Sequence, residues 1–192
     1  MQVSLTFDSD GGDIGHAMAY LDILRARGIH ATFFLTGDFA AAHPDVVRRI
    51  LADGNEIGNH TMDHPDLIHP LRSDSFICSE LVRADQRIAA ADGHTSRPFF
   101  RPPWGNYNDQ VRSLAAGLGY RTVYWSIDPR DWDPATTTQD IINRVLHALG
   151  LKPGAIILMH VNSANEQYAL DDVISGLEQR GYSIVPLSQL IR

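Results

Sequence analysis

The sequence predicts an α/β fold, a distorted (β/α) barrel of about seven parallel strands. Short runs of β-forming residues alternate with longer stretches in which apolar residues recur at helical spacing. Most of the short runs are apolar nearly throughout, as expected of parallel strands covered on both faces. No glycine-rich nucleotide-binding turn follows the first run, so a barrel, open or irregular, is favoured over a doubly wound sheet.

Seven segments are predicted as strands because they are too short for helices and rich in β-branched and aromatic residues. In chain order they are 3–7 (VSLTF), 31–35 (ATFFL), 55–59 (NEIGN), 97–100 (RPFF), 121–125 (RTVYW), 155–159 (AIILM) and 182–185 (YSIV). Six or more helices lie between them, and a glycine just beyond each helix provides a left-handed stop. Their apolar faces run from Ile14 to Leu24, Val46 to Leu51, Ile77 to Ile88, Val111 to Leu118, Ile141 to Leu146 and Val173 to Leu177.

The composition predicts one globular domain spanning residues 1–192, which we expect to be a monomer. A net charge of −7 argues against a surface that binds nucleic acid. No apolar stretch approaches the roughly 18 residues needed to span a bilayer. No signal peptide precedes the first predicted strand. We expect either a secreted or cell-wall-associated protein, whose export signal is absent from this sequence, or a cytoplasmic one.

Polar side chains are concentrated just after the predicted strands. Asp8 and Asp10 follow the first strand, His60 and His64 the third, Arg101 the fourth, Asp128 and Asp131 the fifth, and His160 the sixth. The carboxyl ends of the strands of an α/β barrel open onto one face, where active sites are built. The sequence therefore predicts that these residues meet in one site.

Three of them form a candidate metal site. His60 and His64 are separated by three residues, so both imidazoles can reach one ion, and Asp10 adds a carboxylate from a neighbouring strand. Two histidines and one aspartate leave positions open for water and substrate, which is typical of a catalytic rather than a structural site.

Hydrolysis at such a site also needs a base for the attacking water and an acid for the leaving group. Asp8 is the predicted base and His160 the predicted acid. Arg101 is expected to hold Asp8 ionised, and Asp131 to keep His160 protonated, because an opposite charge nearby favours the charged form. The alternative is that Arg101 and Asp131 form a structural ion pair.

Trp132 and Leu158 flank these groups and are predicted to form an apolar slot for a methyl group. Aromatic residues at strand ends are often core residues instead, so this prediction depends on the rest of the pattern.

Five ordered motifs make the chain resemble the polysaccharide deacetylases, the NodB-like domains of carbohydrate esterase family 4. They are LTFDSDG at 5–11, HTMDHP at 60–65, RPPWG at 101–105, DPRDW at 128–132 and ILMH at 157–160. The resemblance covers essentially the whole chain. It implies a distorted (β/α) barrel that removes acetyl groups from chitin, chito-oligosaccharides, peptidoglycan or acetylxylan. It also implies one divalent metal ion, zinc first, with cobalt, nickel or manganese as alternatives.

The resemblance also assigns roles to residues. Asp8 would be the base, Arg101 would orient it, and Asp131 would tune His160. The acetyl methyl would contact Trp132 and Leu158, and the oxyanion would be held by the metal and a backbone N–H near Trp104.

One departure concerns the first motif, in which the family's adjacent Asp-Asp is replaced by Asp-Ser-Asp. Alternation along an extended strand points Asp8 and Asp10 the same way and Ser9 the opposite way, so we expect Asp10 to be the ligand. The alternative is that Ser9 or a water fills the usual position and Asp10 caps the turn at 11–12. A second departure is Trp104, where the family commonly has tyrosine or phenylalanine.

Two other functions remain as alternatives. One is a cytoplasmic amidohydrolase that acts on a small molecule with the same barrel. The other is a catalytically inactive carbohydrate-binding relative. The set of five motifs argues against the first, and the presence of Asp8, Arg101, Asp131 and His160 together argues against the second.

Overall fold

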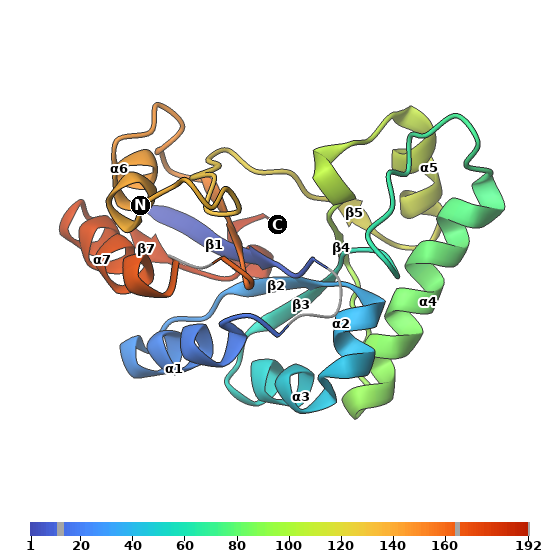
Figure 1. The fold of residues 1–192 in the computed structure, drawn as a ribbon, viewed down its shortest axis with the longest axis horizontal. Coiled ribbons are helices and arrows are strands. Elements are labelled where there is room, and N and C mark those ends of the chain that lie inside the picture. Colours follow the sequence, from blue (N-terminus) through green and yellow to red (C-terminus); the bar gives the residue numbers. More distant parts are fainter. Residues whose placement is uncertain (11–13, 164–165, 192) are drawn as a thin grey trace.

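A computed structural model of the chain describes residues 1–10, 14–163 and 166–191 (Figure 1). The strands are β1 (Gln2–Asp8), β2 (Thr32–Leu35), β3 (Glu56–Asn59), β4 (Phe99–Phe100), β5 (Arg121–Thr122), β6 (Ile156–His160) and β7 (Ser183–Ile184). The α-helices are α1 (Ala17–Arg27), α2 (Gly37–Ala42), α3 (Pro44–Ala52), α4 (Asp74–Asp92), α5 (Asp109–Gly117), α6 (Thr138–Leu146), α7 (Glu166–Gln179) and α8 (Leu187–Leu190), and a 3₁₀ turn, η1, spans Pro103–Gly105.

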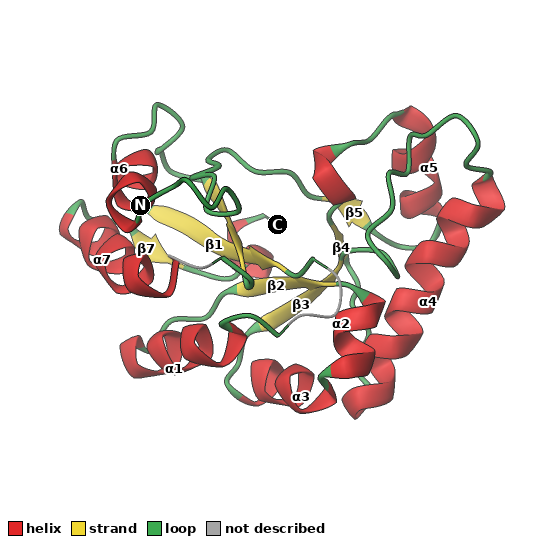
Figure 2. Ribbon diagram, viewed as in Figure 1, coloured by secondary structure: helices red, strands yellow, loops and turns green. Residues whose placement is uncertain are grey.

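All seven strands belong to one parallel sheet in the order β5-β4-β3-β2-β1-β6, and β7 pairs with the start of β1. The sheet is curled, with α1, α2 and α3 along one side, α6 and α7 beside β1, and α4 and α5 beyond β4 and β5 (Figures 1 and 2). Beyond β5 the chain reaches back to β6, where Ile127 bridges Ile157 in parallel. These features confirm the predicted distorted barrel of about seven parallel strands.

Strand β1 shows why the sheet can carry both a core and a site. Val3, Leu5 and Phe7 are fully buried in the main hydrophobic cluster, and the Phe7 ring stacks on Phe33 with centroids 4.9 Å apart. The intervening residues are polar but also buried, and Asp8 ends the strand. Because side chains alternate along a strand, one face of β1 packs against the helices and the other delivers Asp8 to the carboxyl edge of the sheet.

The predicted helices form, with one notable difference in their limits, and two short helices, α2 and α8, were not predicted. The helix predicted from Ile14 begins at Ala17, and Met18 is 39% exposed rather than part of the buried face. Helix α2 was not predicted; the Thr36 side chain caps it by accepting the N–H of Phe39. It is too short to show a helical period in the sequence.

The fifth strand is shorter than predicted. It ends at Thr122, whereas the sequence predicts a strand through Trp125. Past Thr122 the chain leaves the ladder, and Tyr124 is 45% exposed. The exposed aromatic side chain therefore belongs to a loop rather than to a buried strand.

Among the residues that the structure describes, none of the helices is both long enough and apolar enough to cross a membrane.

Candidate functional site

The loops that follow the strands surround a pocket of about 370 Å³. Its lining comprises Asp8, Asp10, His60, His64, Pro102, Trp104, Gly105, Trp125, Asp128, Trp132, Leu158 and His160. These residues come from the ends of β1, β3, β4 and β6 and from the segment after β5. Of the eleven predicted site residues, nine line the pocket, while Arg101 and Asp131 lie buried behind it.

The predicted metal ligands come together. Asp10, His60 and His64 each offer one ligand atom, and these atoms all lie within 4.8 Å of one another. The Nε2 atom of His64 is 3.4 Å from Oδ1 of Asp10. Two imidazoles and one carboxylate at this separation fit the donor set of a divalent transition metal.

The ring of His60 is oriented by a contact with the backbone carbonyl of Arg101. Its Nδ1 atom is 2.7 Å from the carbonyl oxygen of Arg101, an arrangement that leaves Nε2 on the pocket side. A hydrogen bond at the second ring nitrogen fixes ring orientation in many histidine ligands. Burial lowers the pKa of His60 to about 3 and that of His64 to about 4, so in the metal-free chain both are neutral at pH 7, the form that binds metals.

The loop that carries the two histidines has an uncommon backbone. Thr61 and His64 have positive φ angles of 69° and 60°. The buried carboxylate of Glu80 on α4 accepts the N–H groups of Met62 (3.0 Å) and Asp63 (3.3 Å). A left-handed backbone costs non-glycine residues roughly 1–2 kcal/mol each, so it needs such support.

Asp8 is paired as the sequence predicts. Nη1 of the fully buried Arg101 donates to Oδ1 of Asp8 at 2.7 Å, and Oδ2 lies 3.6 Å from Nε2 of His60. The Arg101 guanidinium also lies over the Phe34 ring, 4.1 Å from its centroid. Burial raises the pKa of Asp8, and Arg101 offsets this only in part. In the metal-free chain Arg101 therefore acts in the expected direction without outweighing burial.

His160 is paired with Asp131. The two oxygens of Asp131 accept the His160 backbone N–H (2.7 Å) and face Nδ1 (2.9 Å), and the Ser163 hydroxyl donates to the Asp131 carbonyl. Burial alone lowers the pKa of His160, but the bond and charge of Asp131, with the charges of Asp8 and Asp10, raise it to about 9. Arg101 and Asp131 thus pair with Asp8 and His160, as the acid–base scheme expects.

In the first motif, the side chains of Ser9 and Asp10 point in different directions. Ser9 is fully buried, and its hydroxyl accepts the N–H of Thr36 at 3.0 Å, away from the histidines. Asp10 faces the pocket with His64. The predicted turn at 11–12 lies outside the described residues.

The predicted substrate contacts also lie at the pocket. Leu158 is buried in its wall, and Trp132 is 53% exposed at its edge. Trp104 has a φ of 60°, and its ring meets His64 edge to face with centroids 4.7 Å apart.

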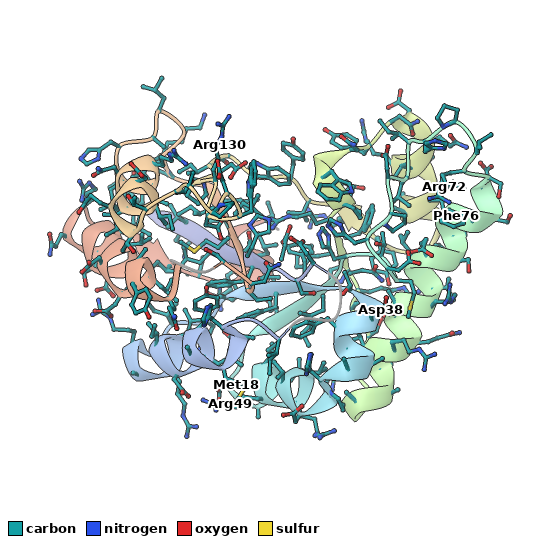
Figure 3. All side chains as sticks on the ribbon, in the orientation of Figure 1. Met18, Asp38, Arg49, Arg72, Phe76 and Arg130 are labelled. Carbon is teal, nitrogen blue, oxygen red and sulfur yellow. The ribbon has the colours of Figure 1, made fainter. Side chains whose placement is uncertain are left out.

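Four non-glycine residues of the described chain have a positive φ: Thr61, His64, Trp104 and Arg130. Arg130, labelled in Figure 3, lies in the loop that leads to Asp131 and Trp132. Unfavourable backbone conformations thus gather in the loops that build the pocket.

Two contributors are absent from the sequence prediction. Glu80 lies inside a helix, and nothing in its local pattern marks it as the support of a distant loop. Trp125 lies on the pocket although the sequence places it in a buried strand. The adjacent pair Tyr124–Trp125, at the carboxyl end of a predicted strand, was the available signal.

Comparisons with known proteins identify the family of the chain. The family model described as polysaccharide deacetylase matches residues 1–123. A chitooligosaccharide deacetylase from Bradyrhizobium sp. (strain ANU 289) is 35% identical over 202 residues, covering 98% of this chain and 90% of that protein. A peptidoglycan-N-acetylglucosamine deacetylase from Bacillus cereus is 35% identical over 197 residues, covering 99% and 88%.

Solved structures share the fold. A family 4 carbohydrate esterase from Streptomyces lividans in complex with acetate has a TM-score of 0.86 and 35% identity, with 95% of this chain and 91% of that chain covered. A family 4 pseudoenzyme from Bacillus anthracis has a TM-score of 0.90 and 29% identity, with coverage of 100% and 65%. Sequence and structure agree on one assignment: the chain belongs to the polysaccharide deacetylase family, carbohydrate esterase family 4.

Proposed function

We propose that this chain is a metal-dependent deacetylase of N-acetylated amino-sugar chains, either chito-oligosaccharides or the glycan strands of peptidoglycan. One observation carries the proposal. The cluster of Asp10, His60 and His64 lies in the same pocket as two separately paired groups, Asp8 with Arg101 and His160 with Asp131. The names of the relatives support this substrate class.

Asp10, His60 and His64 would hold the ion. When bound, a divalent cation polarises an amide carbonyl and lowers the pKa of water, which is the chemistry that the acetyl group requires. Zinc suits two imidazoles and a carboxylate, and cobalt, nickel or manganese could replace it.

The chain's own residues would supply the proton transfers. Arg101 holds one oxygen of Asp8, and the other oxygen, Oδ2, is left to accept a proton from the attacking water. His160 would give a proton to the leaving nitrogen from Nε2, because Nδ1 faces Asp131. Asp131 fixes the ring and keeps it protonated.

The pocket walls would select the acetyl group. Leu158 and Trp132 offer apolar surface for the methyl group, and Trp104 lies on the turn η1, which follows Arg101. A backbone N–H at this turn would help to hold the oxyanion. The glycan strands of peptidoglycan lie outside the cell membrane, so we propose that the enzyme acts there when peptidoglycan is its substrate.

The test is acetate release from chito-oligosaccharides, peptidoglycan and acetylxylan, with the enzyme stripped by chelator and then supplied with Zn²⁺ or Co²⁺. We expect no release after chelation and recovery with added metal. Full turnover by the metal-free enzyme would overturn the mechanism. Metal binding and glycan binding without acetate release under any condition would instead identify an inactive relative.

A further inference from the structure

A line of aromatic rings continues from the pocket onto the surface. Trp125 lines the pocket, and the Tyr124 ring stacks on it with centroids 4.1 Å apart and planes 10° from parallel. Tyr107 meets Tyr124 edge to face at 5.9 Å. Tyr107 and Tyr124 are 42% and 45% exposed. The rings therefore form a surface that begins at the pocket and extends away from it.

Close backbone packing holds this surface in place. Gly105 has a φ of 70°, and a Cβ atom built on it would lie 2.7 Å from Cη2 of Trp125 and 2.8 Å from the Tyr124 hydroxyl. Only glycine lets the turn after β4 press against the aromatic pair after β5. The two segments thus support each other, and the rings keep their position without belonging to any of the hydrophobic core clusters.

The chemistry of these side chains suits a sugar. Tyrosine and tryptophan present a rigid apolar face together with a polar group, and they lose little conformational freedom on binding. A pyranose ring has an apolar face of C–H groups and a rim of hydroxyls, which matches both features. The three residues carry no charge, so they do not discriminate in favour of an ionic ligand.

We propose that Tyr107 and Tyr124, backed by Trp125, form a subsite for one pyranose unit of the glycan substrate. This unit is the neighbour of the one whose acetyl group enters the pocket. The proposal rests on the proposed function and extends it. An enzyme with this subsite prefers oligosaccharides over short substrates, because a longer chain reaches the aromatic surface.

The test compares Tyr124→Ala and Tyr124→Phe with the unchanged protein on chito-oligosaccharides of increasing length. We expect Tyr124→Ala to lower kcat/KM for the hexasaccharide by about 3- to 10-fold, the contribution expected of one aromatic contact. The monosaccharide N-acetylglucosamine, added to the series as its shortest substrate, has no second unit to reach the aromatic surface and should be unaffected. Tyr124→Phe should behave like the unchanged protein. Tyr168→Ala, which removes a 67% exposed tyrosine on α7, is the matched control and should change neither substrate.

Equal losses on short and long substrates, or no loss on either, would overturn the subsite. Calorimetric titration of the hexasaccharide gives a second readout that needs no turnover, and Tyr124→Ala should bind it about 3- to 10-fold more weakly. If the unchanged protein binds the hexasaccharide but releases no acetate, the proposed function fails and the subsite is judged from binding. If Tyr124→Ala binds as tightly as the unchanged protein, the subsite fails.

Discussion

Asp8 and His160 lie in one pocket, and the proposed mechanism gives them opposite roles. Each has a different partner: a fully buried guanidinium for Asp8 and a buried carboxylate for His160. The partner of Asp8 favours the ionised acceptor, and the partner of His160 favours the protonated donor. The sequence predicted these pairings, with an ion pair between Arg101 and Asp131 as the alternative, and the folded structure contains the predicted pairs.

Asp8→Asn and His160→Ala should each lower kcat by roughly 10²–10⁴-fold, the usual contribution of a positioned base or acid. Metal content should stay near that of the unchanged protein in both variants, because neither residue belongs to the cluster of Asp10, His60 and His64. Steady-state kinetics and metal analysis check this. A thermal melt is the control, since Asp8→Asn leaves the buried Arg101 charge without its partner. Near-native kcat in a folded variant would remove that residue from the scheme.

Ser9 and Asp10 can be separated by a matched pair of substitutions. Asp10→Ala should lose bound metal, because the remaining ligands are two neutral imidazoles. Ser9→Ala should keep the metal yet lower the free energy of unfolding by about 1–3 kcal/mol, since the buried N–H of Thr36 loses its acceptor. Metal analysis and urea unfolding distinguish the two effects. Loss of metal only from Ser9→Ala would transfer the ligand role to Ser9.

At the scale of elements, the seven strands and most of the helices were predictable from the sequence because the apolar runs are nearly unbroken and glycines mark the helix ends. The loop conformations were not. Thr61 and His64 have left-handed backbones although neither is a glycine, so the sequence does not indicate this conformation. Glu80, which supports the loop from α4, is too far away in the sequence for a local pattern to reveal the contact. The same holds for the segment 123–127, whose residues look like a strand but lie mostly outside the ladder.

Glu80 gives a prediction about this loop. Glu80→Ala should weaken Zn²⁺ binding by roughly 10-fold or more, within the range for a residue that orients a metal ligand, because the backbone between His60 and His64 loses its acceptor. Glu80→Gln should bind Zn²⁺ nearly as tightly as the unchanged protein, since an amide oxygen can accept the same N–H groups.

Competition with a chromophoric chelator measures the Zn²⁺ affinity of both variants, and a melt in the absence of metal measures stability. If Glu80→Ala lowers the melting temperature but leaves Zn²⁺ affinity unchanged, the carboxylate stabilises the fold without positioning the site.

At the scale of the whole molecule, residues from widely separated segments reach one pocket because every strand is parallel and their carboxyl ends lie at one edge. This rule is why nine pocket residues could be named from the sequence. It does not decide whether Arg101 and Asp131 pair with each other or with Asp8 and His160, and that pairing influences the protonation states. The pKa values of the site residues in the folded chain therefore depend on contacts that the motifs alone do not show.

The pair formed by His160 and Asp131 should make stability depend on pH above neutrality. The pKa of His160 rises from its ordinary value of 6.5 to about 9 in the folded chain. Between pH 6.5 and pH 9 the folded state therefore keeps a proton that the unfolded state has released. The stabilisation is fully present below pH 6.5 and is lost as the pH rises through 9. Its size is on the order of 3 kcal/mol, from 1.36 kcal/mol for each pKa unit. Urea unfolding of the chelator-treated protein at pH 6 and pH 9.5 measures this loss. Asp131→Asn should remove most of the difference, whereas replacing the exposed His147 by Asn should leave it intact. If Asp131→Asn loses as much unfolding free energy between pH 6 and pH 9.5 as the unchanged protein, other groups cause the loss of stability at high pH.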